Sequence, residues 1–264
     1  MPIALSRAAF SPREVARAAD LWRAFQDIAV GGSAAAGYAP ARYVEEKISF
    51  IVRRMVCVHH RETVHGEALT GSTWPSDFKR GMFFRRECRL HAGDDPVASV
   101  TQEWVHVSAD VKLARASASV VASFPIEERD PSIEMPAWQP LDGEPRHHVQ
   151  FECWQTWMDP LGHVNHPRYV DWAEEGVARV MAKAGLDPVR VRPVAESALY
   201  RAGVTAGETV EVQTQLVGVA DAGGAVFSHE MSVGERRVAR VRTVRELVGE
   251  APGTLARALR SSDP

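Results

Sequence analysis

The segment between Trp157 and Tyr169 contains the densest group of side chains that could do chemistry. Asp159 offers a carboxylate, which can take a proton from water or attack a carbonyl carbon. An asparagine and two histidines follow it closely: His163, Asn165 and His166. The spacing therefore predicts a single acid held on a loop, with imidazole and amide groups close behind it.

A helix is expected to start directly after this loop. Pro167 suits the first helical position, so His166 would lie near the N-cap. The free backbone N–H groups at a helix start carry partial positive charge and can hold the oxygen of a polarised thioester carbonyl. Asp159 stands seven residues before His166, so a loop folded across the helix end would bring the acid to that carbonyl.

Each of these residues also has a purely structural interpretation. Asp-Pro followed by Gly is ordinary turn chemistry, and Asp can cap a helix. His163 alone could be a packed or exposed loop histidine, and Asn165 could form an Asx turn. Glu175, on the expected helix, could orient a water or the loop, or face solvent. The clustering of these residues favours the catalytic interpretation.

The elements that would position the loop occur twice. A first helix is expected to begin at Ser11, as N-cap, with Pro12 in the first turn, and to end near Gly31-Gly32. Four strand-like stretches follow it. They span residues 50–58, 69–74, 82–90 and 97–107. The second half repeats this order, with a strand near Phe151, a helix ending near Gly185, and strands at 209–217, 225–233 and 236–247.

Two short matches between the halves share one constant, ungapped offset. Gly66-Glu67 corresponds to Gly207-Glu208, and residues 97–100 correspond to residues 238–241. Together with the repeated helix-then-strands order, they predict a tandem duplication. Prolines among acidic residues mark a linker, residues 125–147, between an N-terminal unit, 1–124, and a C-terminal unit, 148–264.

The predicted fold is α+β. Each unit should be a long central helix wrapped by an antiparallel sheet, which is the hotdog arrangement. Two such units pair side by side, so the chain should be an internal pseudo-dimer, either as a monomer or within a homodimer. The first half has Ala8 to Pro12 where the acidic loop would lie, and it is expected to be non-catalytic.

The loop resembles the active-site signature of hotdog thioesterases of the 4-hydroxybenzoyl-CoA thioesterase type, in which Asp-Pro-x-Gly leads into a helix with Pro and Tyr at its start. The matching residues here are Asp159, Pro160, Gly162, Pro167 and Tyr169. The resemblance implies a base or nucleophile role for Asp159 and a carbonyl-polarising role for the His166 amide. The run from His163 to Asn165, with Tyr169, Trp172 and Glu175, also resembles this superfamily, so Tyr169 and Trp172 are the expected substrate contacts.

From about residue 15 to 247 the chain is similar to the acyl-ACP thioesterases, which are two-hotdog enzymes. The motifs in order include Phe25-Gln26-Asp27, residues 51–55, Thr73-Trp74, Arg85-Arg86 and residues 103–105. Two positions depart from that family. Leu161 stands where the plant-type enzymes carry an asparagine, and Gly203 where they carry a glutamate. The chemistry is therefore expected to depend on Asp159 and the helix-end amide.

Composition limits the remaining possibilities. The net charge of −3 argues against a nucleic-acid binder. No stretch is long and apolar enough for a membrane span, and three sparse cysteines suggest a reducing compartment, so a cytoplasmic protein is expected. Cys57, His59, His60 and His65 match no structural zinc pattern, and no metal or cofactor is expected. Basic runs near Arg53, Arg85 and Arg236 are either solvated strand faces or docking sites for a carrier protein or coenzyme A phosphates.

The sequence thus predicts hydrolysis of a fatty acyl or aryl thioester of acyl carrier protein (ACP) or coenzyme A (CoA) to a free acid and a thiol. One alternative, motivated by Leu161 and Gly203, is a catalytically silent protein that binds acyl thioesters. A second alternative is a hotdog hydratase or dehydratase. Neither half shows a convincing acid and histidine pair for proton transfer at a β-carbon.

Overall fold

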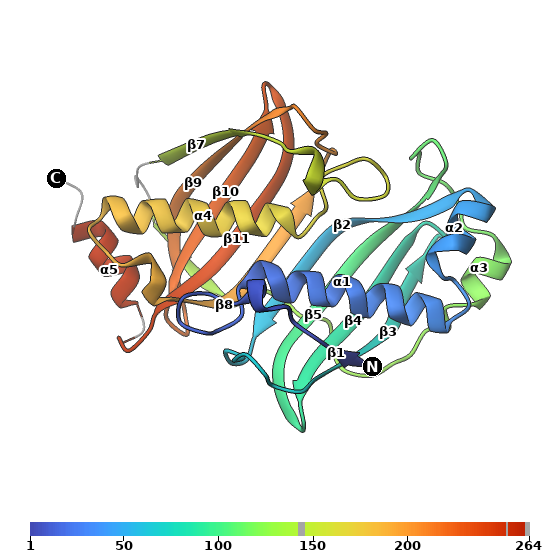
Figure 1. Ribbon diagram of the computed structural model, residues 1–264, viewed down its shortest axis with the longest axis horizontal. Coiled ribbons are helices and arrows are strands. Elements are labelled where there is room, and N and C mark those ends of the chain that lie inside the picture. The colour runs from blue at the N-terminus through green and yellow to red at the C-terminus, as the bar shows by residue number, and fades with distance from the viewer. Residues whose placement is uncertain (142–145, 252, 262–264) are drawn as a thin grey trace.

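A single antiparallel sheet runs through the whole molecule, with both long helices on one face (Figure 1). The computed structural model describes residues 1–141, 146–251 and 253–261. Within these residues the strand order is β1-β3-β4-β5-β2-β8-β11-β10-β9-β6, and β7 also pairs with β9. The first unit contributes β1 to β5 and the second contributes β7 to β11. The two units meet where β2 pairs with β8.

The first unit contains β1 (Pro2–Ile3), α1 (Ala18–Ala35), α2 (Pro40–Glu46), β2 (Ile48–His59), β3 (Leu69–Lys79), β4 (Phe83–Ala92), β5 (Asp95–Ser108) and α3 (Ala118–Ala122). The second contains β7 (Arg146–Glu152), α4 (Arg168–Lys183), β8 (Val191–Tyr200), β9 (Thr209–Ala220), β10 (Ala225–Val233), β11 (Arg236–Leu247) and α5 (Thr254–Ser261). The predicted strands are all present. The sequence interpretation missed the strands β1, β6 and β8 and the helices α2, α3 and α5, of which β6 (Trp138–Pro140) lies in the stretch assigned as a linker.

Apolar spacing explains why the helices form and where they pack. In α1 the buried residues Leu21, Trp22, Phe25 and Ile28 recur every three or four positions, which gives one apolar face toward the sheet. Residue Gly176 allows α4 to approach β9 closely, because a Cβ at this position would overlap with Oγ1 of Thr214. The main hydrophobic cluster joins residues of α1, α4 and both sheet halves, so the two units share one core.

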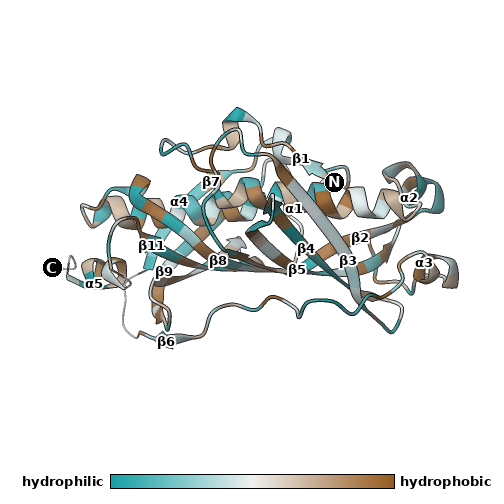
Figure 2. Cartoon of the chain, turned by 90° about the horizontal axis from the view of Figure 1, so that it is seen from below, coloured by the Kyte–Doolittle hydropathy of each residue, from teal (hydrophilic) through white to brown (hydrophobic). Residues whose placement is uncertain are grey.

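The helices cover one face of the sheet, and the segment between the units runs along the other face (Figure 2). The stretch assigned as a linker, residues 125–147, includes the short strand β6 (Trp138–Pro140) and the first residues of β7. Residues 142–145 of this stretch lie outside the described part. Contacts such as Ile133 N–H to Thr101 Oγ1 (2.6 Å) hold the segment against β5.

The predicted start of the first helix was wrong. The helix begins at Ala18, and residues 10–16 form a loop closed by a bridge between Phe10 and Ala16. Ser11 Oγ accepts the N–H of Arg13 (3.2 Å) within this loop, and Glu14 has a left-handed backbone (φ 61°) and pairs with Arg7. Ser11 is therefore a turn residue and does not cap the helix. The helix also continues past Gly31-Gly32, to Ala35.

Candidate active site

The Asp159 loop is a compact turn tied to the start of α4. Its ends are joined by a bridge between Met158 and Val164, and Asp159 N–H donates to the carbonyl of His163 (2.7 Å). Gly162 has a left-handed backbone (φ 76°), a conformation that glycine adopts without strain. Pro167 lies at the N-cap and the helix begins at Arg168, one residue later than predicted. The loop is therefore folded across the helix end, as the sequence indicated.

One carboxylate oxygen of Asp159 is held inside the loop. Oδ1 accepts the N–H of Leu161 (2.8 Å) and more weakly the N–H of His163 (3.3 Å). These are the bonds of an Asx turn, so the structural interpretation of this residue is correct as far as Oδ1 is concerned. The side chain is only partly buried. A partly exposed carboxylate that two backbone donors orient through one oxygen can still serve as a base or nucleophile.

His163 and Asn165 have different surroundings. The imidazole of His163 packs against Gly203, where a Cβ would overlap with Cδ2 of the ring. The backbone N–H of Asn165 donates to the carbonyl of Trp157 (2.9 Å), which closes the loop. Its side-chain Oδ1 is buried and has no partner in the described residues. A buried amide oxygen without a partner is costly, and it marks a place where a ligand group could donate.

His166 lies where the two units meet. Its ring is 6.2 Å from that of Trp104 in β5 and 6.0 Å from that of Tyr200 in β8, measured between centroids. Burial, reinforced by the nearby Arg23 guanidinium, lowers the pKa of His166 to about 3, so the ring is neutral near pH 7. Its Nε2 is buried without a partner in the part of the chain that the structure describes.

Two aromatic residues predicted to contact substrate form the wall behind the loop. Tyr169 and Trp172 are buried in α4, with ring centroids 4.6 Å apart. Trp157 packs on Trp172 at 6.0 Å, and the exposed Trp154 stacks on Trp157 at 5.2 Å. Tyr200 was not predicted from the sequence. Its hydroxyl donates to the carbonyl of His166 (2.9 Å) and so holds the helix start in place.

Glu175 is not brought to the site. Its side chain is exposed and forms an ion pair with Arg179, one helical turn later (2.6 Å). The neighbouring Glu174 points instead toward α1, where its carboxylate accepts the N–H groups of Ala18 (3.2 Å) and Ala19 (3.4 Å). Burial raises the pKa of Glu174 to about 7. The sequence could not distinguish these two adjacent acids.

The loop of the first half has the same geometry without the acid. Ser11 N–H donates to Val15 O (2.8 Å), as Asp159 N–H does to His163 O. The bridge Phe10–Ala16 joins residues with the same separation as those of the bridge Met158–Val164. Ser11 and Val15 thus occupy the places of Asp159 and His163, so the first-half loop has no carboxylate at the position of Asp159 and no imidazole at the position of His163.

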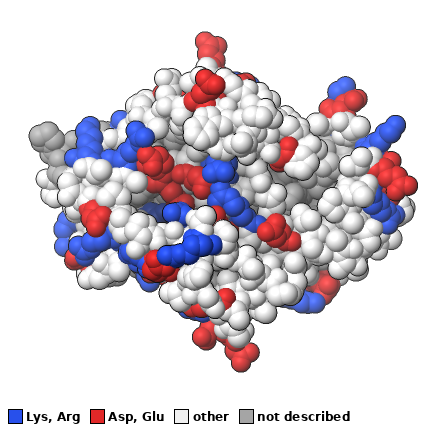
Figure 3. Space-filling model, in the orientation of Figure 1, with Lys and Arg blue, Asp and Glu red and all other residues white. Residues whose placement is uncertain are grey.

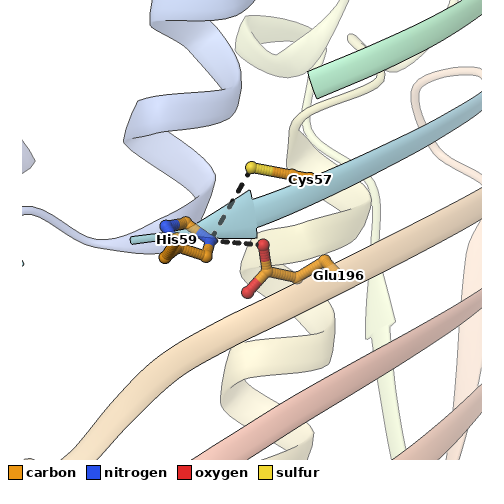
Figure 4. A group of neighbouring side chains, drawn as sticks. All are labelled: Cys57, His59 and Glu196. Atoms are coloured by element: carbon orange, nitrogen blue, oxygen red, sulfur yellow. Dashed lines mark hydrogen bonds and ion pairs between the residues drawn. The ribbon is translucent and has the colours of Figure 1, made fainter. Parts of the chain in front are cut away.

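A buried polar cluster lies near the start of α1, at the junction of β2 and β8. Donor atoms of Cys57, His59 and Glu196 all lie within 4.8 Å of one another (Figure 4). His59 Nε2 is 2.6 Å from a carboxylate oxygen of Glu196, and Arg245 and the indole N–H of Trp22 also donate to this carboxylate. Because the guanidinium of Arg245 already balances its charge, we interpret the cluster as an ion-pair network rather than a cation site.

Most arginines of the predicted basic runs are paired within the chain. Arg245 binds Glu196, Arg240 binds Glu230, and Arg236 binds Glu208. Arg86 and Arg89 are buried. On the face that carries the helices, basic and acidic side chains are intermixed (Figure 3). These runs therefore do not form a uniformly basic surface on that face.

Among the described residues, no helix has the length and apolar character needed to cross a membrane.

Comparison with known proteins agrees with the fold. Residues 153–250 match the family model of the thioesterase-like superfamily. No curated protein sequence matches the chain. Solved structures that superimpose over nearly its whole length include three thioesterases. A protein assigned as an oleoyl thioesterase from Lactobacillus plantarum has a TM-score of 0.78 and 18% identity, and the match covers 95% of each chain.

The other two are similar in extent. An acyl-ACP thioesterase from Bacteroides thetaiotaomicron has a TM-score of 0.72 and 16% identity, covering 93% of this chain and 96% of that one. The 12:0-ACP thioesterase from Umbellularia californica has a TM-score of 0.73 and 14% identity, covering 94% and 93%. The predicted α+β double hotdog is confirmed: the chain has the fold of these three thioesterases, and residues 153–250 match the thioesterase-like superfamily.

Proposed function

We propose that this chain hydrolyses an acyl thioester to a free acid and a thiol, with one active site per chain at the Asp159 loop. The observation that carries the proposal is the position of this loop across the N-terminal end of α4, inside the region that matches the thioesterase-like superfamily. The similar solved structures include thioesterases named for oleoyl and 12:0-ACP substrates. Their names support a fatty acyl thioester of ACP or CoA as the substrate.

The proposed reaction uses two groups of the site, the backbone N–H of His166 and the carboxylate of Asp159. The thioester carbonyl oxygen accepts the N–H of His166 at the helix start, where the helix dipole favours developing negative charge. Asp159 takes a proton from a water whose oxygen attacks the carbonyl carbon, or its carboxylate attacks that carbon directly and water then releases the acid. The C–S bond breaks, and the sulfur leaves as a thiolate that takes up a proton.

Other loop residues support this step. His163 lies on the same turn as Asp159, and its ring packs against Gly203. Asn165 Oδ1 offers an acceptor for a polar group of the substrate. Tyr169 and Trp172 form the apolar wall against which the acyl group lies. Glu175 is exposed and has no part in this mechanism.

Loss of catalysis is the alternative that a specific observation favours. Leu161 is 40% exposed and apolar, and Gly203 has no side chain, so two polar groups found in the plant-type family are missing from the loop region. A protein that binds acyl thioesters without turnover would have this composition. The difference between the two functions lies in the release of thiol.

A thiol-release assay on matched panels of acyl-CoAs and acyl-ACPs tests the proposal. Free thiol and free acid should appear in equal amounts, and the ratio of kcat/KM between the panels identifies the carrier. Binding without thiol release would instead support the silent protein. Hydration of an enoyl substrate without thiol release would support the hydratase alternative.

A further inference from the structure

Helices α1 and α4 are related by an approximate two-fold axis that passes close to one ion pair. The bridges Phe10–Ala16 and Met158–Val164 align the loops before the helices at one constant offset. The same offset aligns Arg23 with Asp171, and the side chains of these two residues form an ion pair between the helices. Equivalent residues that contact each other must lie near the axis. Contacts made on one side of this pair therefore have counterparts on the other side.

One such contact closes the start of α1. The carboxylate of Glu174 accepts the N–H groups of Ala18 and Ala19, at 3.2 and 3.4 Å. Under the same relation Ala18 corresponds to His166 and Glu174 corresponds to Gln26. The two-fold relation thus positions the side chain of Gln26, on α1, opposite the backbone N–H of His166. Gln26 is partly buried, and the neighbouring Arg23 is close enough to lower the pKa of His166.

The N-terminal ends of α1 and α4 differ in which polar groups lack a hydrogen-bond partner. At α1, the carboxyl group of Glu174 caps the helix start. At α4, the His166 N–H donates no hydrogen bond within the described residues, and Asn165 Oδ1 and His166 Nε2 are buried without partners. Gln26 is a neutral amide, which has both a donor and an acceptor. The start of α4, which follows the Asp159 loop, is therefore the helix end whose polar groups remain free to bind a ligand.

We propose that Gln26, supplied by the first hotdog unit, donates a hydrogen bond from Nε2 to the thioester carbonyl oxygen, as the second donor beside the N–H of His166. This inference rests on the proposed function. When water attacks, the C=O electron pair moves onto this oxygen, and both donors stabilise the resulting negative charge until the C–S bond breaks. A glutamate at this position would cap the amide, as Glu174 does, and would repel the oxyanion. The active site is thus completed across the two units.

The test compares Gln26→Ala and Gln26→Glu with Val30→Ala, an exposed position on the same helix (43% exposed). Removing one oxyanion donor should lower kcat by about 100- to 1,000-fold with KM changed only a few-fold. Gln26→Glu should be at least as inactive, and Val30→Ala should equal wild type. Affinity for an S-alkyl-CoA thioether, which has no carbonyl, should be unchanged in Gln26→Ala. Affinity for the ketone analogue, in which CH2 replaces the sulfur, should fall.

The outcomes separate this inference from the proposed function. If Asp159→Asn abolishes thiol release while Gln26→Ala keeps a kcat within about threefold of wild type, only the role of Gln26 is overturned. If Asp159→Asn is also active, the proposed function itself fails. If wild type releases no thiol, the role of Gln26 is still tested by calorimetry, which compares the binding of the ketone and the thioether to wild type and to Gln26→Ala. Equal effects of Gln26→Ala on both analogues, or no effect on either, overturn the inference.

Discussion

The imidazole of His163 lies directly on the backbone of Gly203, so that a Cβ at position 203 would be 2.8 Å from Cγ and 2.9 Å from Nε2 of the ring. The glycine that departs from the plant-type pattern is therefore the residue that makes room for the histidine of the Asp159 loop. The carbonyl of Gly203 also accepts a hydrogen bond from Arg236, which fixes the backbone on which the ring rests.

Gly203→Ala should displace His163 and disturb the loop. We expect a loss of about 1–3 kcal/mol in unfolding free energy, as for other overpacked sites, and at least a tenfold loss of kcat. Urea unfolding and thiol release measure both effects. The matched control is His163→Ala, in which the added methyl meets no ring. If Gly203→Ala is as destabilising in the His163→Ala background as in wild type, the two residues do not compete for space.

The first-half loop should not become active when its acid is restored. Ser11 occupies the place of Asp159, but Glu174 caps the adjacent helix start and the Glu196–Arg245 pair fills the space nearby. The double variant Ser11→Asp/Asp159→Asn should therefore remain as inactive as Asp159→Asn alone in a thiol-release assay. Recovery of turnover in the double variant would show that the first site is open.

The Asp159 loop shows which parts of the site could be predicted from the sequence. The sequence indicated the Asp159 turn and the helix behind it, because Asp-Pro-x-Gly and the apolar spacing are local signals. It misplaced the start of α1, because Ser11-Pro12 with Glu14 also fits a capping box. The ungapped offset that matches Gly66 with Gly207 could not align the two loops, since helix α2 is inserted between the first loop and its strands.

Other parts of the site left no local signal. Tyr200 and Trp104 reach His166 from β8 and β5, and only the pairing of the two halves of the sheet brings them together. The choice between Glu174 and Glu175 depends on the rotation of α4 against α1, which apolar spacing does not determine to within one residue. Sheet pairing and helix packing are tertiary properties, so these contacts had to be seen in the structure.

Glu196→Gln should strongly destabilise the junction of the two units. It leaves the buried guanidinium of Arg245 without its counter-charge, which typically costs about 3–5 kcal/mol. The exposed pair Glu175–Arg179 provides the contrast, and Glu175→Gln should cost at most about 1 kcal/mol. Chemical unfolding of both variants checks this. Similar losses in the two variants would mean that burial does not set the strength of the pair.

Glu196 should also contribute to the decrease in unfolding free energy at low pH. Burial opposes ionisation of Glu196, but His59 and Arg245 outweigh it and lower its pKa to about 2, below the ordinary value of 4.5. Its contribution is therefore complete above pH 4.5 and is lost as the pH falls toward 2. Unfolding free energy measured from pH 6 to pH 2 should decline less steeply in Glu196→Gln than in wild type. Parallel curves would contradict the assignment.

Glu174 should have the opposite effect on the pH dependence of the unfolding free energy, and at higher pH. Because burial raises its pKa to about 7, the folded state holds a proton that the unfolded state has released above pH 4.5. Stability should therefore fall as the pH rises from 4.5 to 7, and Glu174→Gln should remove this part of the slope. Thermal unfolding at pH 5, 6, 7 and 8 measures it. An unchanged pH profile in Glu174→Gln would show that the carboxylate is ionised throughout.

The most direct test of the whole account is the rate of thiol release by Asp159→Asn. The asparagine keeps the Oδ1 acceptor for the N–H groups of Leu161 and His163, so the loop and the unfolding free energy should be preserved. We expect wild type to hydrolyse at least one acyl thioester of the CoA and ACP panels, and Asp159→Asn to lower kcat by at least about 100-fold. Turnover close to that of wild type in a folded Asp159→Asn protein would contradict it.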